Sequence, residues 1–159
     1  MELNEKQFRK VSLTLEIFRS QIDLYSKIKG DTDLLDDFMS LNRNPFFDLT
    51  NNKFFKTGLL SNEVKKSNLK NKEIVHDHFI QRKKSMNLLF NLLLENPNMS
   101  VDEFIVFMKQ HSSTVGITKD EHMKVTIMAK GSDEYNFNLY VKCGIIVEGL
   151  DNFIGHINN

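Results

Sequence analysis

The segment EIVHDHFIQRKK, residues 73–84, brings together residue types that phosphate chemistry uses. Two histidines flank an aspartate in it and three cations follow; these are His76, Asp77 and His78, then Arg82, Lys83 and Lys84. A carboxylate suits Mg²⁺ or Mn²⁺ as a ligand, and an imidazole that is neutral near physiological pH suits the role of general base. Arginine, lysine and the free N–H groups of a helix start attract phosphate. The segment therefore indicates either a place where a divalent metal and a phosphate meet, or a polar turn between two buried elements.

A third donor, His122, stands in the step ITKDEH, residues 117–122. The strand predicted for EIVHDHF and the strand predicted for STVGI, residues 113–117, can pair as antiparallel neighbours. That pairing brings the end of the first strand to the first turn of the helix after the second, so that Asp77, His78 and His122 converge. Phosphodiester hydrolysis uses such a cluster, because a divalent metal polarises the phosphate and a base deprotonates the attacking water.

Each of these residues also has an ordinary structural interpretation. His76 and His78 can be exposed polar residues where a strand turns into a loop, with Asp77 forming a turn hydrogen bond. Glu121 stands three residues after Thr118, which is the spacing of a helix capping box, and we expect a cap there rather than a catalyst. The three cations can form an ordinary solvated patch.

The remaining histidines and the cysteine receive structural assignments. His111 follows a predicted helix that begins at Ser100, where an imidazolium interacts favourably with the C-terminal helix dipole. His156 near the chain end is a weaker candidate. Cys143 is the only cysteine, which excludes an intramolecular disulfide and zinc sites with paired cysteines. We expect it to be a buried thiol in a strand.

Steps of three and four residues predict the first helix, which ends near Gly30. Its apolar stripe consists of Phe8, Val11, Leu15, Phe18, Ile22 and Tyr25. The stripe is either part of the core or a coiled-coil seam through which two copies of the chain form a homodimer. A shorter acidic helix follows in residues 31–42, with Asp31 or Thr32 as its cap. The side chains expected to point inward from it are Leu34, Leu35, Phe38 and Leu41.

The middle and the end of the chain are less regular. Residues 44–72 indicate an irregular, partly extended connection, and two helices on either side of Asn96-Pro97 form a hairpin inserted between the two strands. Residues 118–131 carry helix end signals, including a C-cap at Gly131, but also a β-branched run, and we favour the helix. The tail, residues 135–149, alternates apolar and polar residues and predicts a strand.

Composition sets wider limits on the chain. At 159 residues and 40% hydrophobic, it suits one domain, which we divide into an N-terminal helical part (1–44) and an α+β core (45–159). Its 21 Lys and Arg balance 21 Asp and Glu, so a nucleic acid would have to be held by a local patch. The sequence contains no apolar run long enough to span a membrane and opens on a charged segment. We therefore expect no membrane partner and a cytoplasmic location, in the host cell if the protein is viral.

Two of these motifs resemble those of the HNH, or ββα-metal, nucleases. In that family an Asp-His or Glu-His pair ends the first strand, and phage-borne members often enter the helix through a Leu/Ile-Thr-x-x-Glu-His step. Asp77-His78 is similar to the pair, and ITKDEH is similar to the step. The resemblance implies a ββα-metal-like core, with His78 as general base and with Asp77 and His122 as ligands of Mg²⁺ or another divalent metal.

The expected fold is therefore α+β, with N-terminal helices and a small antiparallel sheet that contains the inserted hairpin. The expected function is metal-dependent endonuclease activity on DNA, with Arg82 contacting the phosphate in catalysis and Lys83 and Lys84 binding the nucleic acid. A rival from another class is a non-catalytic small protein that binds and modulates a host or viral protein, which the neutral net charge favours. A third is nucleic-acid binding without cleavage, which would depend steeply on salt.

Overall fold

The computed structural model describes residues 3–50, 56–111, 113–130, 132, 134 and 136–154; for Phe47, Thr50, Phe153 and Ile154 it describes the backbone alone. Backbone contacts divide the chain into two compact units. Unit 1 comprises residues 1–55 and 82–109, and unit 2 comprises residues 56–81 and 110–159. The chain therefore leaves unit 2 for a pair of helices and then returns to it. The expected single domain stays a prediction.

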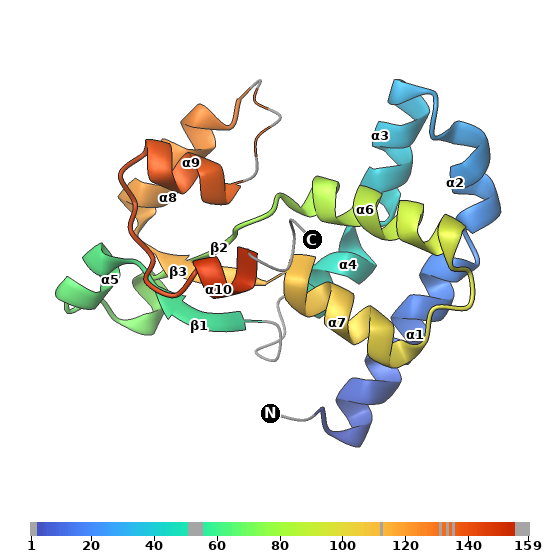
Figure 1. The fold of residues 1–159 in the computed structure, drawn as a ribbon, viewed down its shortest axis with the longest axis horizontal. Coiled ribbons are helices and arrows are strands. Elements are labelled where there is room, and N and C mark those ends of the chain that lie inside the picture. Colours follow the sequence, from blue (N-terminus) through green and yellow to red (C-terminus); the bar gives the residue numbers. More distant parts are fainter. Residues whose placement is uncertain are drawn as a thin grey trace. The chain divides into compact units, whose positions relative to one another are not determined.

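Unit 1 is built from helices (Figure 1). Their bounds are α1 Glu5–Arg19, α2 Ile22–Ile28, α3 Thr32–Leu41, α4 Arg43–Thr50, α6 Arg82–Glu95 and α7 Val101–His111, of which the last two residues belong to unit 2. The long first helix of the prediction is two helices, because α1 closes at Ser20, whose N–H bonds back to Glu16 and Phe18. The inserted helical hairpin is confirmed as α6 and α7, and α6 ends before Pro97 as expected.

The capping signals of unit 1 act as predicted. The Asp31 side chain accepts hydrogen bonds from the backbone N–H groups of Asp33 and Leu34 and so caps α3. Ser100 and Glu103 exchange side-chain and backbone hydrogen bonds at the start of α7. The inward face of α3 was predicted less well, since Leu34 is 50% and Leu41 80% exposed while Phe38 is buried. Caps depend on neighbours in sequence, whereas the choice of buried face depends on what packs against the helix.

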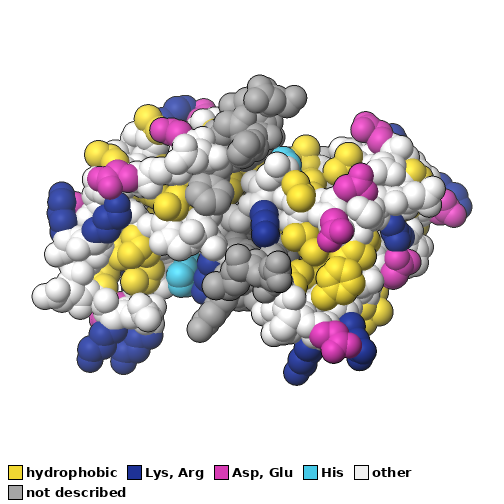
Figure 2. All heavy atoms as spheres, turned by 60° about the horizontal axis from the view of Figure 1, so that its bottom comes forward, with side chains coloured by type: hydrophobic (Ala, Val, Ile, Leu, Met, Phe, Trp, Pro, Cys, Tyr) yellow, Lys and Arg dark blue, Asp and Glu magenta, His cyan; other side chains and the backbone are white. Residues whose placement is uncertain are grey.

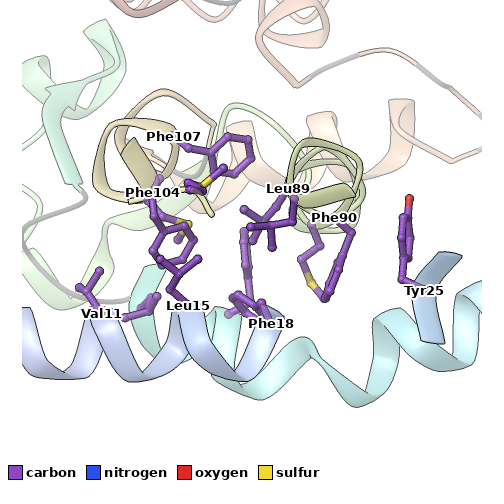
Figure 3. Close-up of a cluster of buried hydrophobic side chains, with 14 of the residues drawn as sticks. Val11, Leu15, Phe18, Tyr25, Leu89, Phe90, Phe104 and Phe107 are labelled. Carbon is purple, nitrogen blue, oxygen red and sulfur yellow. The ribbon is translucent and has the colours of Figure 1, made fainter. Parts of the chain in front are cut away.

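The core of unit 1 is apolar and aromatic (Figure 3). Val11, Leu15 and Phe18 of the predicted stripe are buried in it, together with Tyr25. Phe90 of α6 is fully buried and lies at its centre; its ring centroid lies 5.6 Å from that of Phe18, 5.1 Å from that of Tyr25 and 4.8 Å from that of Phe38. These four stripe residues pack within their own unit, and a homodimer through the N-terminal helix stays a prediction.

Unit 2 contains a mixed sheet of three strands in the order β1-β3-β2. The strands are β1 Lys56–Leu60, β2 Val75–His78 and β3 Thr114–Ile117. The predicted antiparallel pairing of the last two is confirmed, with Asp77 opposite Val115. The expectation of a purely antiparallel sheet is wrong, because β1 runs parallel to β3. β1 lies within residues 44–72, which were predicted to form an irregular, partly extended connection. A register shift and the positive φ of Gly58 (78°) interrupt β1, which explains why its sequence does not alternate clearly.

The helices of unit 2 are α5 Asn62–Lys66, α8 Lys119–Met128, α9 Asn136–Lys142 and α10 Asp151–Ile154, with a 3₁₀ turn, η2, at Asn71–Glu73. The predicted helix after β3 is confirmed as α8; its expected C-cap, Gly131, lies outside the described residues. The strand predicted for the tail is wrong, because residues 136–142 form α9. In α9 Phe137, Leu139 and Tyr140 are buried while Val141 is 79% exposed, so the apparent alternation was part of a helical face.

The chain is thus α+β, with a small sheet and many helices. The core of unit 2 packs around Phe79, Ile80, Val115, Ile117, Val125 and Tyr140. Lysine, arginine and carboxylate side chains are interspersed with apolar groups on the face that Figure 2 shows. None of the helices in the described part is both long and apolar enough to cross a membrane.

Candidate functional site

The carboxylate of Asp77 is the centre of a buried polar cluster in unit 2. Asp77 is 7% exposed and lies one residue before the end of β2. Its Oδ1 atom lies 3.2 Å from Nδ1 of His122, and its Oδ2 atom accepts a 2.6 Å hydrogen bond from the Tyr140 hydroxyl. Groups from β2, α8 and α9 therefore meet at one carboxylate. Of the predicted site residues, the structure brings Asp77 and His122 into contact.

The first turn of α8 is held in place by Glu121. Its Oε2 atom accepts hydrogen bonds from the Thr118 backbone N–H (2.8 Å) and from the Ser61 hydroxyl (2.7 Å), while its own N–H donates to the Thr118 side chain. The predicted capping box is confirmed, and the bond to Ser61 ties it to the chain segment that follows β1. Since His122 is the next residue, these bonds position the helix turn that carries its side chain.

His122 presents its imidazole partly to solvent, with 44% of the side chain exposed. Its hydrogen bond to Asp77 raises the pKa of His122 above the ordinary value; partial burial opposes this shift and the negative charge of Asp77 adds to it. The carboxylate thus stabilises positive charge at this position, whether that charge is a proton on the ring or an ion beside it.

Tyr140 and Asn136 complete the cluster from α9. Burial raises the pKa of the Tyr140 hydroxyl well above its usual value, and the charge of Asp77 and its hydrogen bond with Tyr140 act in the same direction, so the hydroxyl remains a donor. The Asn136 amide donates to the backbone oxygen of His78 at 2.6 Å and reaches Asp77 Oδ2 at 3.4 Å. Both residues were missed from the sequence, because their spacing of four marks one helix face only if the tail is helical.

His78 ends β2 with a buried side chain, whereas His76 is exposed. Strict strand alternation would place the two histidines on one side and Asp77 on the other. Asp77 and His78 are both buried at the strand end and both keep regular pairing with β3, so the two faces of the strand are covered there. The interpretation of both histidines as exposed turn residues is therefore wrong for His78. The assignment of His78 as general base stays a prediction.

The three cations lie in unit 1, where Arg82 is the first residue of α6, as the predicted helix start requires. Lys83 is exposed and forms an ion pair with Asp36. Arg82 and Lys84 are half-buried, and both have contacts within the structure. Their predicted contacts with phosphate and nucleic acid stay predictions.

Asp77 and His122 fit a small divalent ion in their chemistry and spacing. Two ligands that each lie about 2.1 Å from one ion at a right angle are about 3 Å from each other. The observed 3.2 Å between Oδ1 and Nδ1 is the length of a hydrogen bond, and it also lets both atoms reach one small ion when Nδ1 carries no proton. Among the described residues no group of three or more His, Cys, Asp or Glu side chains is placed to hold an ion. An ion at this pair would therefore take its remaining ligands from water or phosphate, which is usual for Mg²⁺.

His76, His111 and Cys143 take no part in the contacts with Asp77 described above. Burial lowers the pKa of His111, so the expected stabilisation of an imidazolium by the helix dipole does not dominate there. Burial and the charge of Lys56 lower the pKa of His76. Cys143 follows α9 rather than lying in a strand, with its Sγ 3.8 Å from the Met128 sulfur. His156 lies outside the described residues.

Comparison with known proteins adds no assignment to this geometry. No protein-family model matches the chain, and no curated protein or solved structure matches it either.

Proposed function

We propose that this protein is a metal-dependent endonuclease that hydrolyses phosphodiester bonds in DNA. The observation that supports the proposal is the contact of Asp77, at the end of β2, with His122, in the first turn of α8. β2 pairs with β3 as an antiparallel neighbour, and α8 follows β3 directly in the chain. These three elements give the order strand, strand, helix. This order resembles the ββα-metal core to which the motifs of the sequence are similar.

In the proposed mechanism Asp77 and His122 would hold Mg²⁺ or a similar divalent ion. When bound, the ion would polarise the phosphate and stabilise charge on the leaving oxygen. His78 accepts the proton of the attacking water, a role for which a neutral imidazole is suited. From the sequence, Arg82 is proposed as the residue that contacts phosphate, and Lys83 and Lys84 as residues that bind the nucleic-acid backbone, so the affinity for DNA should fall with salt.

Plasmid nicking with and without EDTA tests the proposal. The parent chain should convert supercoiled plasmid to the nicked form with Mg²⁺ or Mn²⁺, and EDTA should abolish this activity. His78→Ala should reduce the rate by about 100-fold or more, because it removes the general base. His76→Ala is the matched control, since His76 is an exposed histidine on the same strand. Activity that is absent, insensitive to EDTA or equal in the parent and His78→Ala would contradict the proposal.

A non-catalytic role in binding a host or viral protein is the second candidate function. It is favoured by exposed apolar side chains in unit 2, which are Met123, Ile127, Met128, Val141 and Ile146. Ile127 and Met128 line a shallow apolar groove of about 290 Å³ together with Lys124 and Cys143. Contiguous exposed apolar surface is typical of interaction sites.

Pull-down from lysate separates the two candidates. If the second is correct, a stoichiometric partner should be retained when His76, His78 and His122 are all replaced by alanine, and it should be lost with Ile127→Glu. Loss of the partner only with the histidine variant would argue against this surface and in favour of the cluster around Asp77.

A further inference from the structure

The two oxygen atoms of the Asp77 carboxylate have different partners. Oδ2 accepts the short hydrogen bond from the Tyr140 hydroxyl, at 2.6 Å, and lies 3.4 Å from the Asn136 amide nitrogen. Oδ1 lies beside Nδ1 of His122 instead. One oxygen is thus directed toward donors on α9, and the other is directed toward α8.

This difference matters because a carboxylate turns easily about its terminal bond. A hydrogen bond from a hydroxyl to a charged carboxylate is strong at this length, and burial strengthens it further. Tyr140 is 1% exposed and Asn136 8%, so water competes little for either donor. The Asn136 amide also donates to the backbone oxygen of His78, which connects α9 to the end of the strand that carries Asp77.

We propose that Tyr140, assisted by Asn136, is a positioning residue that holds Asp77 as a ligand through Oδ1 alone, directed toward His122. The inference rests on the proposed function in so far as Asp77 and His122 share an ion. It adds that α9, which lies outside the strand–strand–helix order, is required for that ion to bind tightly.

The arrangement has a consequence for the choice of metal. Mg²⁺ and Mn²⁺ are small ions, and a carboxylate held through one oxygen suits them, whereas Ca²⁺ readily accepts both oxygens of a carboxylate. Tyr140 engages Oδ2 and so disfavours binding through both oxygens. The site should therefore prefer Mn²⁺ over Ca²⁺, and removal of the Tyr140 hydroxyl should weaken that preference.

The experiment measures the binding of Mn²⁺ and of Ca²⁺ to the full chain by titration calorimetry. Tyr140→Phe is compared with the parent and with the control variant Tyr25→Phe. Tyr25 is also a buried tyrosine whose hydroxyl forms hydrogen bonds with side chains, those of Asn87 and Asn91, but it lies in unit 1. Tyr140→Phe should lower Mn²⁺ affinity by about 10–100-fold, the usual effect of losing an outer partner of a metal ligand. Its Ca²⁺ affinity should fall less, and Tyr25→Phe should match the parent.

Equal Mn²⁺ affinity in the parent and Tyr140→Phe, equal losses for both ions, or no Mn²⁺ binding by the parent would each overturn the inference. Should Tyr140→Phe fail to unfold cooperatively, Asn136→Ala provides the same comparison, because it removes the second donor to Oδ2. Plasmid nicking separates this inference from the proposed function. If Tyr140→Phe weakens Mn²⁺ binding but the parent does not nick plasmid, the positioning role stands and the nuclease proposal fails. If Tyr140→Phe leaves Mn²⁺ binding unchanged and nicking depends on His78, the nuclease proposal stands and the positioning role fails.

Discussion

Units 1 and 2 bury different kinds of side chain. In unit 1 the core is mainly hydrocarbon, although a few neutral polar side chains are buried there as well, and Phe18, Tyr25, Phe38 and Phe90 contact one another through their rings. In unit 2 the interior includes Asp77 and Glu121, the two buried carboxylates of the described chain. Burying a charged group costs free energy unless it is paired and hydrogen-bonded, so a fold that only had to be stable would gain little from them.

The two buried carboxylates of unit 2 differ from each other as well. Glu121 has a structural explanation, since it caps α8 and joins it to Ser61. Asp77 is held by Tyr140 on one side and faces a partly exposed histidine on the other. A buried carboxylate in contact with a partly exposed histidine whose pKa is raised is typical of functional sites, which is why the proposals concern Asp77 and His122.

The largest effect on stability should come from the core of unit 1. Phe90→Ala should lower the free energy of unfolding by about 3–5 kcal/mol, because it removes a fully buried ring and leaves a cavity. Urea denaturation followed by circular dichroism measures the change. Phe8→Ala is the control, as Phe8 is 43% exposed and its loss should cost much less. A loss under about 1 kcal/mol for Phe90→Ala would mean that the aromatic core carries little stability.

Replacing Asp77 should separate binding from stability. Asp77→Asn should lower Mn²⁺ affinity and nicking by about 100-fold or more, yet change the free energy of unfolding by only about 1 kcal/mol, since the amide keeps the shape and removes a buried charge. Glu121→Gln is the matched control at the other buried carboxylate. Glutamine keeps an acceptor oxygen for the Thr118 N–H and the Ser61 hydroxyl, so the cap of α8, the stability and the Mn²⁺ affinity should all stay close to those of the parent. A loss of Mn²⁺ affinity in Glu121→Gln but not in Asp77→Asn would assign the metal-binding role to Glu121 instead.

The sheet of unit 2 provides a test of packing that does not involve charge. A Cβ at position 116 would lie 2.5 Å from Leu60 Cδ2 and 2.9 Å from Ile74 Cγ2, so Gly116→Ala should cost about 1–3 kcal/mol. Combining it with Leu60→Ala should cost less than the sum of the two single changes, because the closest contact is removed. Gly30→Ala is the control, since nothing lies within 4 Å of its Cβ. Additive losses in thermal unfolding would contradict this contact.

The smallest expected effect concerns His111, whose pKa is lowered by burial. The folded chain then binds fewer protons than the unfolded chain below the ordinary pKa of about 6.5, so stability present above this pH is lost as the pH falls toward the folded pKa. His111→Gln should reduce the loss of stability between about pH 7 and pH 5.5 relative to the parent. Identical pH dependence in urea denaturation of the two proteins would show that burial does not control this histidine.

Signals between near neighbours in sequence predicted much of the fold. The capping residues Asp31, Ser100 and Thr118 each begin a helix at the expected place, and the pairing of β2 with β3 placed Asp77 near His122. These predictions succeeded because the partner groups lie within a few residues or across one strand pair. β1 was not predicted as a strand, because its register shift interrupts the alternation of side chains in its sequence. α9 was not predicted as a helix, because its apolar and polar residues alternate as in a strand.

The sequence by itself determined which donors are available and which helix turns carry them, because residue type and capping act locally. Only the tertiary structure decided how Asp77 is oriented, since Tyr140 lies 63 positions further along the chain and reaches the carboxylate through a helix that the pattern did not predict. A hydrogen bond of this kind requires the two heavy atoms to lie within a few tenths of an ångström of the ideal distance and the donor to point at the acceptor. Packing between distant segments sets that geometry, and spacing in the sequence does not encode it.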